Sequence, residues 1–285
     1  MTEGIVVRCQ AGLGASMAAA VYRRSGSPIV LLHGIPGGRG TWRRVVPGLT
    51  AFGPVVVPDL LGFGDSSDPP GDFHAFAQAG AVGRLLDHVG LERVHVVGFD
   101  FGGPVSVAFA EQQPTRVASL TLVAANAFTD TPIPGPLKLA KVPVLGDALF
   151  LAMCSWPGLA SMWFSAVAAK PELSWQAFRR ELPARRGRRW TRRIFLDSLR
   201  HLEDRYAPIE RALPRITCPT RVVWGDRDPF FTVSVGERLA NAINGATFEV
   251  IRHCGHFIPL ERPDALVRVI GRQLLDSPAP ARLSR

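Results

Sequence analysis

The segment from Val94 to Gly103 joins an apolar strand pattern to a residue that can do chemistry. It reads Val-His-Val-Val-Gly-Phe-Asp-Phe-Gly-Gly and places Asp100 at the centre of a G-x-D-x-G pattern. The flanking glycines permit the tight strand-to-helix turn of a nucleophile elbow, whose central residue is usually Ser. An Asp at a helix start often only caps the helix. Here the context favours a nucleophile, because a carboxylate (pKa about 3.9) is ionised at pH 7 and attacks carbon without a base.

The partners of such a nucleophile follow later in the chain. Asp228 comes after an apolar run that ends in Trp224-Gly225, and His256 stands between Gly255 and Phe257. We expect Asp228 to orient His256 and His256 to take a proton from water. Asp226 is predicted to cap the turn instead.

Oxyanion donors are predicted from two backbone N–H groups. His33-Gly34-Ile35-Pro36 follows another apolar strand, and we expect the N–H groups of Ile35 and Phe101 to stabilise negative charge on Asp100. No metal is expected, because His253 and His256 have no second cluster of ligands nearby in the sequence.

With the loop from Pro58 to Ser66, these motifs resemble those of the α/β-hydrolase superfamily over nearly the whole chain. The Asp at the elbow resembles the Asp-nucleophile branch, which contains epoxide hydrolases and haloalkane dehalogenases. That resemblance implies two steps without a cofactor: the carboxylate forms an alkyl-enzyme ester, and His-activated water then hydrolyses it.

Short apolar runs alternate with helical patterns, which predicts a mostly parallel eight-stranded sheet with helices on both faces, in the α/β class. The predicted strands are Ile5–Cys9, Met17–Tyr22, Ile29–His33, Val55–Pro58, His95–Gly98, Leu120–Ala124, Arg221–Gly225 and Thr247–Arg252. The predicted helices are Trp42–Leu49, His74–Val89, Gly102–Gln112, Val233–Ala242 and Pro263–Leu275.

The stretch between the sixth and seventh strands breaks this rhythm and predicts a helical cap. Frequent prolines there cut the chain into short helices. We expect a core formed by residues 1–126 and 215–285, with a cap or lid at 127–214.

The departures from the branch's patterns favour epoxide opening. Dehalogenases hold the leaving halide with side-chain N–H donors at positions where this chain has Ile35 and Phe101. The H-G-x-P loop resembles that of epoxide hydrolases, which use two cap tyrosines as acids. Only Tyr206 falls in the cap here, so it is the candidate single acid, with a Trp N–H or His201 as candidates to assist it. A dehalogenase, an ester or lactone hydrolase and a non-catalytic binding protein remain alternatives.

Aromatic residues in and below the cap predict a pocket for a bulky hydrophobic substrate, aromatic or polycyclic. The candidate substrate-binding residues are Phe99, Trp156, Trp163, Trp175 and Trp190.

The composition points to a cytoplasmic enzyme. The chain has 285 residues, a net charge of +9, few lysines and four widely spaced cysteines that we read as reduced thiols. The Arg-rich run from Arg179 to Arg193 is interpreted as a solvated helix surface, so nucleic acid is not expected as a partner. No apolar run approaches the roughly 20 residues needed to span a bilayer, so a membrane is not expected either. We expect a monomer or homodimer. The Arg- and Ala-rich, Lys-poor composition resembles that of high-GC bacteria, in which such hydrolases often serve secondary metabolism or xenobiotic breakdown.

Overall fold

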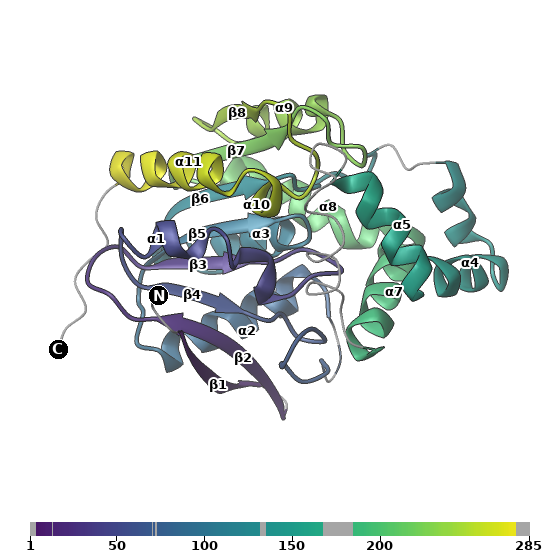
Figure 1. Ribbon diagram of the computed structural model, residues 1–285, viewed down its shortest axis with the longest axis horizontal. Helices are drawn as coiled ribbons and strands as arrows, with labels where there is room; N and C mark the ends of the chain where they lie inside the picture. Colours follow the sequence, from purple (N-terminus) through teal and green to yellow (C-terminus); the bar gives the residue numbers. More distant parts are fainter. Residues whose placement is uncertain are drawn as a thin grey trace.

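The computed structural model describes residues 4–12, 14–69, 71, 73–131, 135–167 and 185–277. Eight strands form a single sheet in the order β1-β2-β4-β3-β5-β6-β7-β8 (Figure 1). Strands β1 and β2 pair antiparallel at one edge, β2 also pairs antiparallel with β4, and the other pairings are parallel. The predicted mostly parallel eight-stranded sheet is therefore confirmed.

All eight strands fall where the sequence predicts them, with ends that shift by up to three residues. Their bounds are β1 Ile5–Gly12, β2 Ala15–Tyr22, β3 Ile29–Leu32, β4 Val55–Pro58, β5 Val94–Phe99, β6 Val117–Val123, β7 Thr220–Gly225 and β8 Thr247–Ile251.

Helices cover both faces of the sheet. The helices α2 (Ala75–His88), α3 (Gly102–Gln112) and α9 (Val233–Asn241) pack on one face, and α1 (Val46–Leu49) and α11 (Pro263–Asp276) pack on the other. Alternate residues of the central strands supply the two cores: Val30 and Leu32 belong to the first, and Ile29 and Leu31 to the second. Side chains on a strand alternate between faces, so strands buried on both faces must be apolar throughout.

The predicted helix Trp42–Leu49 is wrong in its first half. A short 3-10 helix, η1 (Arg39–Trp42), precedes α1 there, with Pro47 in the first turn of α1. Proline has no N–H to donate to a preceding turn, so a helix starts at it more readily than it runs through it. Three short elements were also not predicted: η2 (Pro114–Arg116), η5 (Leu213–Arg215) and α10 (Ile258–Glu261).

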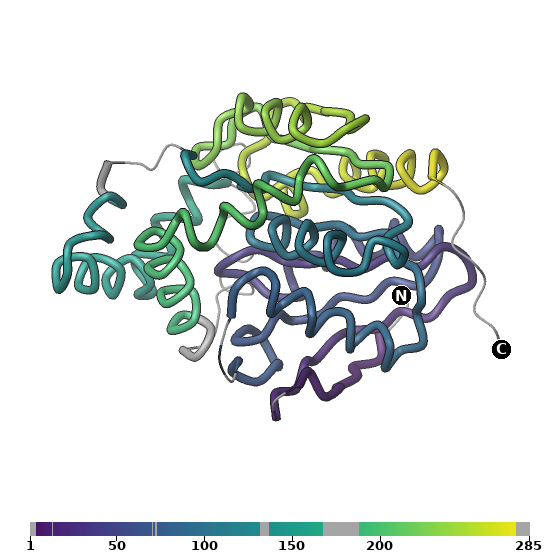
Figure 2. Tube along the Cα trace, turned by 180° about the vertical axis from the view of Figure 1, so that it is seen from behind, coloured from purple at the N-terminus to yellow at the C-terminus, as the bar shows by residue number. Residues whose placement is uncertain are grey.

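A helical insertion follows β6, as expected. It contains η3 (Gly135–Lys141), α4 (Leu145–Met153), α5 (Trp156–Ala166), α7 (Arg185–Arg200) and α8 (Leu202–Ala212). From behind, these segments lie at one end of the sheet (Figure 2). The limits 127 and 214 for the cap stay predictions.

No single helix among the described residues has the length and hydropathy to cross a bilayer. The bent pair α4 and α5, broken by 69°, meets that test on length and composition when taken together.

Candidate active site

Asp100 stands in a left-handed turn between β5 and α3. Its φ is 51°, a conformation that Asp adopts more easily than most residues. Glycine is required around this turn: a Cβ on Gly98 would lie 2.2 Å from the Ser106 Oγ, and one on Gly102 would lie 2.3 Å from the Leu32 carbonyl oxygen. The glycines thus let the chain turn tightly enough to lift Asp100 above the end of the sheet.

The loop after β3 holds one oxygen of this carboxylate. The Ile35 N–H donates to Oδ1 of Asp100 over 2.8 Å, as the sequence predicts for an oxyanion donor. Gly34 permits the close approach, since a Cβ there would lie 2.4 Å from the Asp100 Cβ. Phe101, the other expected donor, lies at the start of α3, and the role of its N–H stays a prediction.

His33 fixes this loop from below. Burial lowers the pKa of His33, so its ring is neutral at pH 7. The Leu60 N–H donates to Nε2 over 2.9 Å, and Nδ1 therefore carries the proton and donates to the Gly34 carbonyl over 2.8 Å. His33 is a positioning residue that the sequence shows only as part of a motif.

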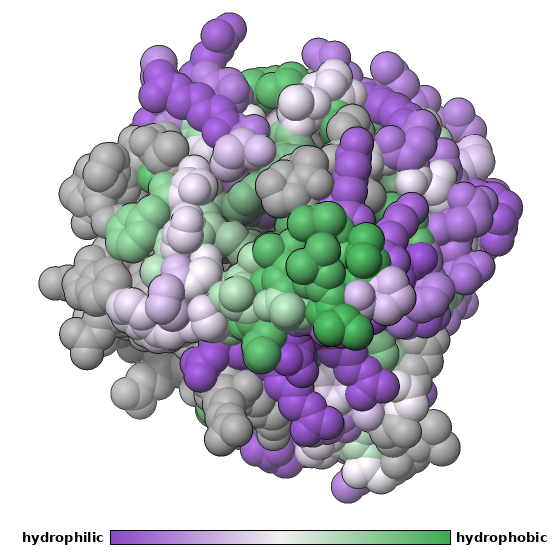
Figure 3. All heavy atoms as spheres, turned by 90° about the vertical axis from the view of Figure 1, so that its right-hand side faces the viewer, coloured by the Kyte–Doolittle hydropathy of each residue, from purple (hydrophilic) through white to green (hydrophobic). Residues whose placement is uncertain are grey.

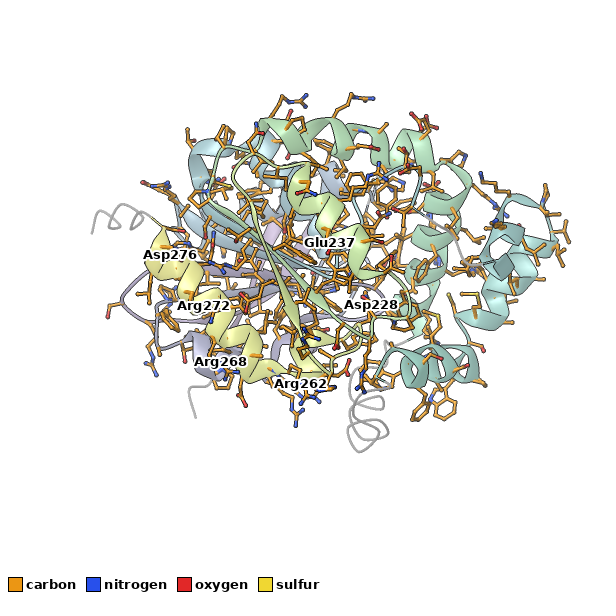
Figure 4. The ribbon with its side chains drawn as sticks, turned by 90° about the horizontal axis from the view of Figure 1, so that it is seen from above. Asp228, Glu237, Arg262, Arg268, Arg272 and Asp276 are labelled. Atoms are coloured by element: carbon orange, nitrogen blue, oxygen red, sulfur yellow. The ribbon has the colours of Figure 1, made fainter. Side chains whose placement is uncertain are left out.

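Asp228 and His256 form a buried pair beside Asp100. Nδ1 of His256 lies 2.7 Å from Oδ2 of Asp228, and Nε2 lies 3.5 Å from Oδ2 of Asp100. The Asp228 side chain has no exposed surface, and its Oδ1 accepts from the N–H groups of Phe230 and Phe231 at 2.8 and 3.1 Å. Seen from above, Asp228 lies toward the cap helices, and α11 runs away from it to Asp276 (Figure 4).

Asp226 serves the neighbouring loop instead. Its Oδ1 accepts from the Cys254 N–H over 3.0 Å and ties the end of β7 to the turn after β8. Of the two carboxylates, Asp228 is therefore the one that reaches the imidazole.

Two opposing effects act on the protonation of His256. Burial lowers its pKa, but the negative charges of Asp228 and Asp100 outweigh burial and raise the pKa to about 10. The ring is thus an imidazolium at neutral pH.

The loop of His256 is anchored on two sides. The His256 N–H donates to the Ala166 carbonyl at the end of α5 over 3.1 Å. The preceding Gly255 N–H donates to the buried carboxyl of Glu261 over 3.1 Å. Burial raises the pKa of Glu261. Sequence reasoning missed both contacts, because neither Ala166 nor Glu261 belongs to a motif.

A cavity of about 110 Å³ opens above Asp100. Its lining is mostly apolar, with a few polar side chains: Ile35, Asp100, Phe101, Pro104, Asn126, Thr131, Leu137, Ile194, Phe195, Ser198, Leu199, Leu202, Tyr206 and Phe231. Among these residues there is no Arg, Lys or His. The cavity therefore suits an uncharged hydrophobic ligand with one or two polar groups.

Tyr206 of α8 lines this cavity. The sequence alone does not predict whether Tyr206 faces the active site. Burial and the negative charge of Asp100 raise its pKa, while a hydrogen bond with Ser198 of α7 opposes the rise. The phenol thus keeps its proton at neutral pH and can donate it.

Four of the candidate substrate-binding residues do not line the cavity as described. Phe99 is 1% exposed and packs against the His256 ring, with centroids 5.2 Å apart, because it points to the opposite face of β5. Trp163 packs on Phe257, and Trp156 is 43% exposed. Trp190 donates its indole N–H to Asp68 over 2.7 Å and docks α7 onto the core. Trp175 lies outside the described residues.

Metal and disulfide chemistry receive no support from the described residues. No group of three or more His, Cys, Asp or Glu side chains there could hold a metal ion. Cys9, Cys154, Cys218 and Cys254 are free.

The family model described as alpha/beta hydrolase fold matches residues 27–263. The chain belongs to this family. Its relatives carry several activities in their names. A 2-hydroxy-6-oxononadienedioate/2-hydroxy-6-oxononatrienedioate hydrolase of Cupriavidus pinatubonensis is 30% identical, over 85% of this chain and 84% of that protein. A soluble epoxide hydrolase of a Corynebacterium species is 28% identical, over 85% of this chain and 88% of that protein.

Solved structures agree on the α/β-hydrolase fold. A 2-hydroxy-6-oxo-6-phenylhexa-2,4-dienoate hydrolase from a Rhodococcus species has a TM-score of 0.78 at 25% identity, and the match covers 96% of this chain and 100% of that one. The epoxide hydrolase CorEH has a TM-score of 0.77 at 22% identity, covers 96% of this chain and 99% of that chain, and shows the fold alone. The chain is thus an α/β-fold hydrolase by family, and its substrate has to be argued from the site.

Proposed function

We propose that this α/β-hydrolase opens epoxides of hydrophobic substrates to diols through a covalent ester on Asp100. The observation that carries the proposal is the set of groups that surround the Asp100 carboxylate. One oxygen is bound by the Ile35 N–H, and the other faces His256, below a mostly apolar cavity that Tyr206 also lines.

In the first step Oδ2 of Asp100 attacks a ring carbon of the epoxide. A carbon–oxygen bond to Asp100 forms as the ring carbon–oxygen bond breaks, and Tyr206 gives its proton to the released oxygen. The products are a hydroxyalkyl ester on Asp100 and a tyrosinate. A nearby phenol is a useful acid here, since an alkoxide is otherwise a poor leaving group.

Formation of the ester changes the protonation of His256. The negative charge on Asp100 is one of the causes that raise the pKa of His256 to about 10, and an ester carries no such charge. The pKa of His256 therefore falls once the first step is complete. The imidazolium can release its proton, which returns to the strongly basic oxygen of Tyr206, and the ring becomes a base.

In the second step neutral His256 takes a proton from water, and the hydroxide attacks the carbonyl carbon of the Asp100 ester. The Ile35 N–H stabilises the resulting oxyanion. The intermediate breaks its bond to the substrate oxygen, which receives the proton from His256, and the diol leaves. Asp100 now carries one oxygen from water as a carboxylic acid. It passes its proton to His256, which restores the carboxylate and the imidazolium, so that epoxide and water together give the diol.

Dehalogenation by the same two steps is the alternative, and the cavity lining disfavours it. A leaving halide needs N–H donors, yet no Trp is among the described lining residues, and the indole N–H of Trp190 is bound to Asp68. The hydroxyl of Tyr206 can donate a proton to the oxygen released from an epoxide at least as well as it can donate a hydrogen bond to a halide.

The substrate named for the Cupriavidus relative is a dicarboxylate, and this cavity does not match it. A buried dianion requires cationic partners. The described lining contains no Lys, Arg or His, and it contains the anion of Asp100.

Trapping of the ester tests the proposal. The variant His256→Gln keeps Asp100 but lacks the base, so a covalent ester should accumulate. The variant is exposed to aromatic epoxides and to haloalkanes, and intact mass and peptide mapping follow. Asp100→Ala is the matched control, because it removes the carboxylate from the same site.

A mass gain of one whole epoxide on Asp100, absent from Asp100→Ala, supports the proposal. A gain of the haloalkane less its hydrogen halide would identify a dehalogenase instead. No adduct with any substrate that the wild-type enzyme turns over would exclude the Asp100 ester.

A further inference from the structure

The outer surface of the insertion presents apolar side chains to solvent. Val144 is 81% exposed, Leu151 59% and Leu145 51%, and Val142 and Leu139 are also exposed. We call these five residues the η3–α4 face. Figure 3 looks toward the cap end of the molecule and shows a compact apolar patch with hydrophilic side chains along its right and lower borders.

The interior of the cap does not need these residues. A separate small core beneath the face contains Ala140, Phe150 and Leu196. On α4, Phe150 is buried in that core, whereas Leu145 and Leu151 are exposed to solvent. The exposed side chains therefore do not belong to the core of the cap. A contiguous exposed apolar patch of this kind marks an interaction site.

The backbone supports this reading at Val144. Its φ is 63°, a conformation that β-branched residues rarely adopt. The chain therefore holds its most exposed valine in a strained turn, and strain of this kind tends to persist where it serves a function.

Cations border the face. Lys138 and Lys141 of η3 are exposed beside Leu139 and Val142. A groove of about 380 Å³ lies beyond α4 and is lined by arginines of α7, among them Arg189 and Arg192. No carboxylate of the described residues forms an ion pair with either of these two.

The acidic residues of this groove are already paired. Asp147 lies 2.9 Å from Arg200, and Asp197 lies 2.7 Å from Arg205. The surroundings of the η3–α4 face are therefore positive and would attract an anionic partner.

We propose that the η3–α4 face docks on the surface of an anionic lipid bilayer. The aliphatic side chains enter the interface, and Lys138, Lys141 and the groove arginines face the lipid phosphates. An apolar face with basic residues at its border is the pattern of interfacial binding. The hydropathy of the α4–α5 pair agrees with it. The sequence predicts no membrane partner because no apolar run reaches a spanning length, but docking needs a face and not a span.

Docking would place the cap against the phase in which hydrophobic substrates dissolve. Leu137 of η3 lines the cavity above Asp100, and Leu139, two residues on, belongs to the η3–α4 face. The lipid surface and the cavity are therefore adjacent along the chain.

Co-sedimentation of the full-length protein with vesicles tests the proposal. Vesicles of phosphatidylcholine alone are compared with vesicles that also contain phosphatidylglycerol. We expect binding only to the anionic vesicles, and weaker binding in high salt.

Two pairs of variants locate the binding surface. V144D/L151D should weaken binding by roughly tenfold or more, because it puts charge into the interface. The control is L275D on α11, next to Asp276 and far from the cap (Figure 4), where Leu275 is 77% exposed. K138E/K141E should also weaken binding, and R23E/R24E, which reverses two exposed charges elsewhere, should not.

Other results would overturn the proposal. One such result is that the wild-type protein does not bind anionic vesicles. Another is that cap and control variants lose vesicle binding equally, which would indicate a general effect of the net positive charge. Sedimentation velocity without lipid supplies a further test. A dimer that V144D/L151D dissociates would assign the face to a second copy of this chain.

Discussion

Nε2 of His256 lies 3.5 Å from Oδ2 of Asp100, while Nδ1 of the same ring lies 2.7 Å from Oδ2 of Asp228. One imidazole thus bridges two carboxylates with different surroundings. The Asp228 side chain is fully buried and accepts from two backbone N–H groups, whereas the Asp100 side chain is 16% exposed and borders the cavity. The exposed carboxylate is available to a substrate, and the buried one is available only to the imidazole.

This bridge should make stability depend on pH. The pKa of His256 is raised from about 6.5 in the unfolded chain to about 10 in the fold. A raised pKa stabilises the fold fully below pH 6.5, and this contribution is lost as pH rises through 10. We expect the urea midpoint to fall between pH 7 and pH 10, and to fall less in His256→Gln. Equal slopes in the two proteins would contradict a charged His256.

Asp228→Asn should slow hydrolysis of the ester far more than its formation. The amide cannot hold the proton on Nδ1 or balance the imidazolium, and loss of such a carboxylate costs up to about 10⁴ in turnover in a comparable triad. Rapid-quench mass spectrometry should show the ester accumulating. The matched control is Asp226→Asn, which removes a similar carboxylate two residues away, and it should mainly lower the melting temperature, because Asp226 ties the two loops together.

Tyr206→Phe should slow epoxide opening by about 10²–10⁴, the range for loss of a general acid. The effect should appear in the alkylation rate in single turnovers, with ester hydrolysis little changed. Tyr22→Phe is a control, since the only other tyrosine lies in β2. Ser198→Ala should give a smaller loss, because it removes only the hydroxyl bonded to Tyr206. An unchanged rate in Tyr206→Phe would assign the acid to another group.

Gly34→Ala should destabilise the protein by about 1–3 kcal/mol, the usual cost of an overpacked site. The added methyl would lie 2.4 Å from the Asp100 Cβ, so activity should fall by more than the folded fraction does. In Gly71→Ala the added Cβ meets no atom within 4 Å, and neither stability nor activity should change appreciably. Denaturant curves and assays of both variants provide the comparison.

The sequence predicts the parts of the site that depend on local backbone geometry. Gly98, Asp100 and Gly102 predict a turn that only certain residues can form. Asp100, Asp228 and His256 each follow a predicted strand, and the carboxyl ends of parallel strands meet at one edge of the sheet, which brings the three side chains together. The fold could be predicted for the same reason, since buried parallel strands leave an unmistakable apolar pattern.

The sequence does not predict which aromatic side chains reach the cavity. Phe99 is adjacent to Asp100, but neighbours on a strand point to opposite faces, and Phe99 supports His256 from the other core. Trp190 binds Asp68, a contact between residues 122 positions apart. Such contacts depend on how the cap helices pack against the core, and the local sequence pattern does not predict that packing.

The hydrogen bond from the His256 N–H to the Ala166 carbonyl ties the loop of His256 to the last turn of the cap helix α5. A Cβ at Gly255 would lie 2.2 Å from that same carbonyl oxygen, so the two segments meet as closely as backbones can. A movement of α5 that admits a substrate or releases a product therefore also displaces the loop that holds His256. Access to the cavity and the position of the imidazole are coupled through this contact.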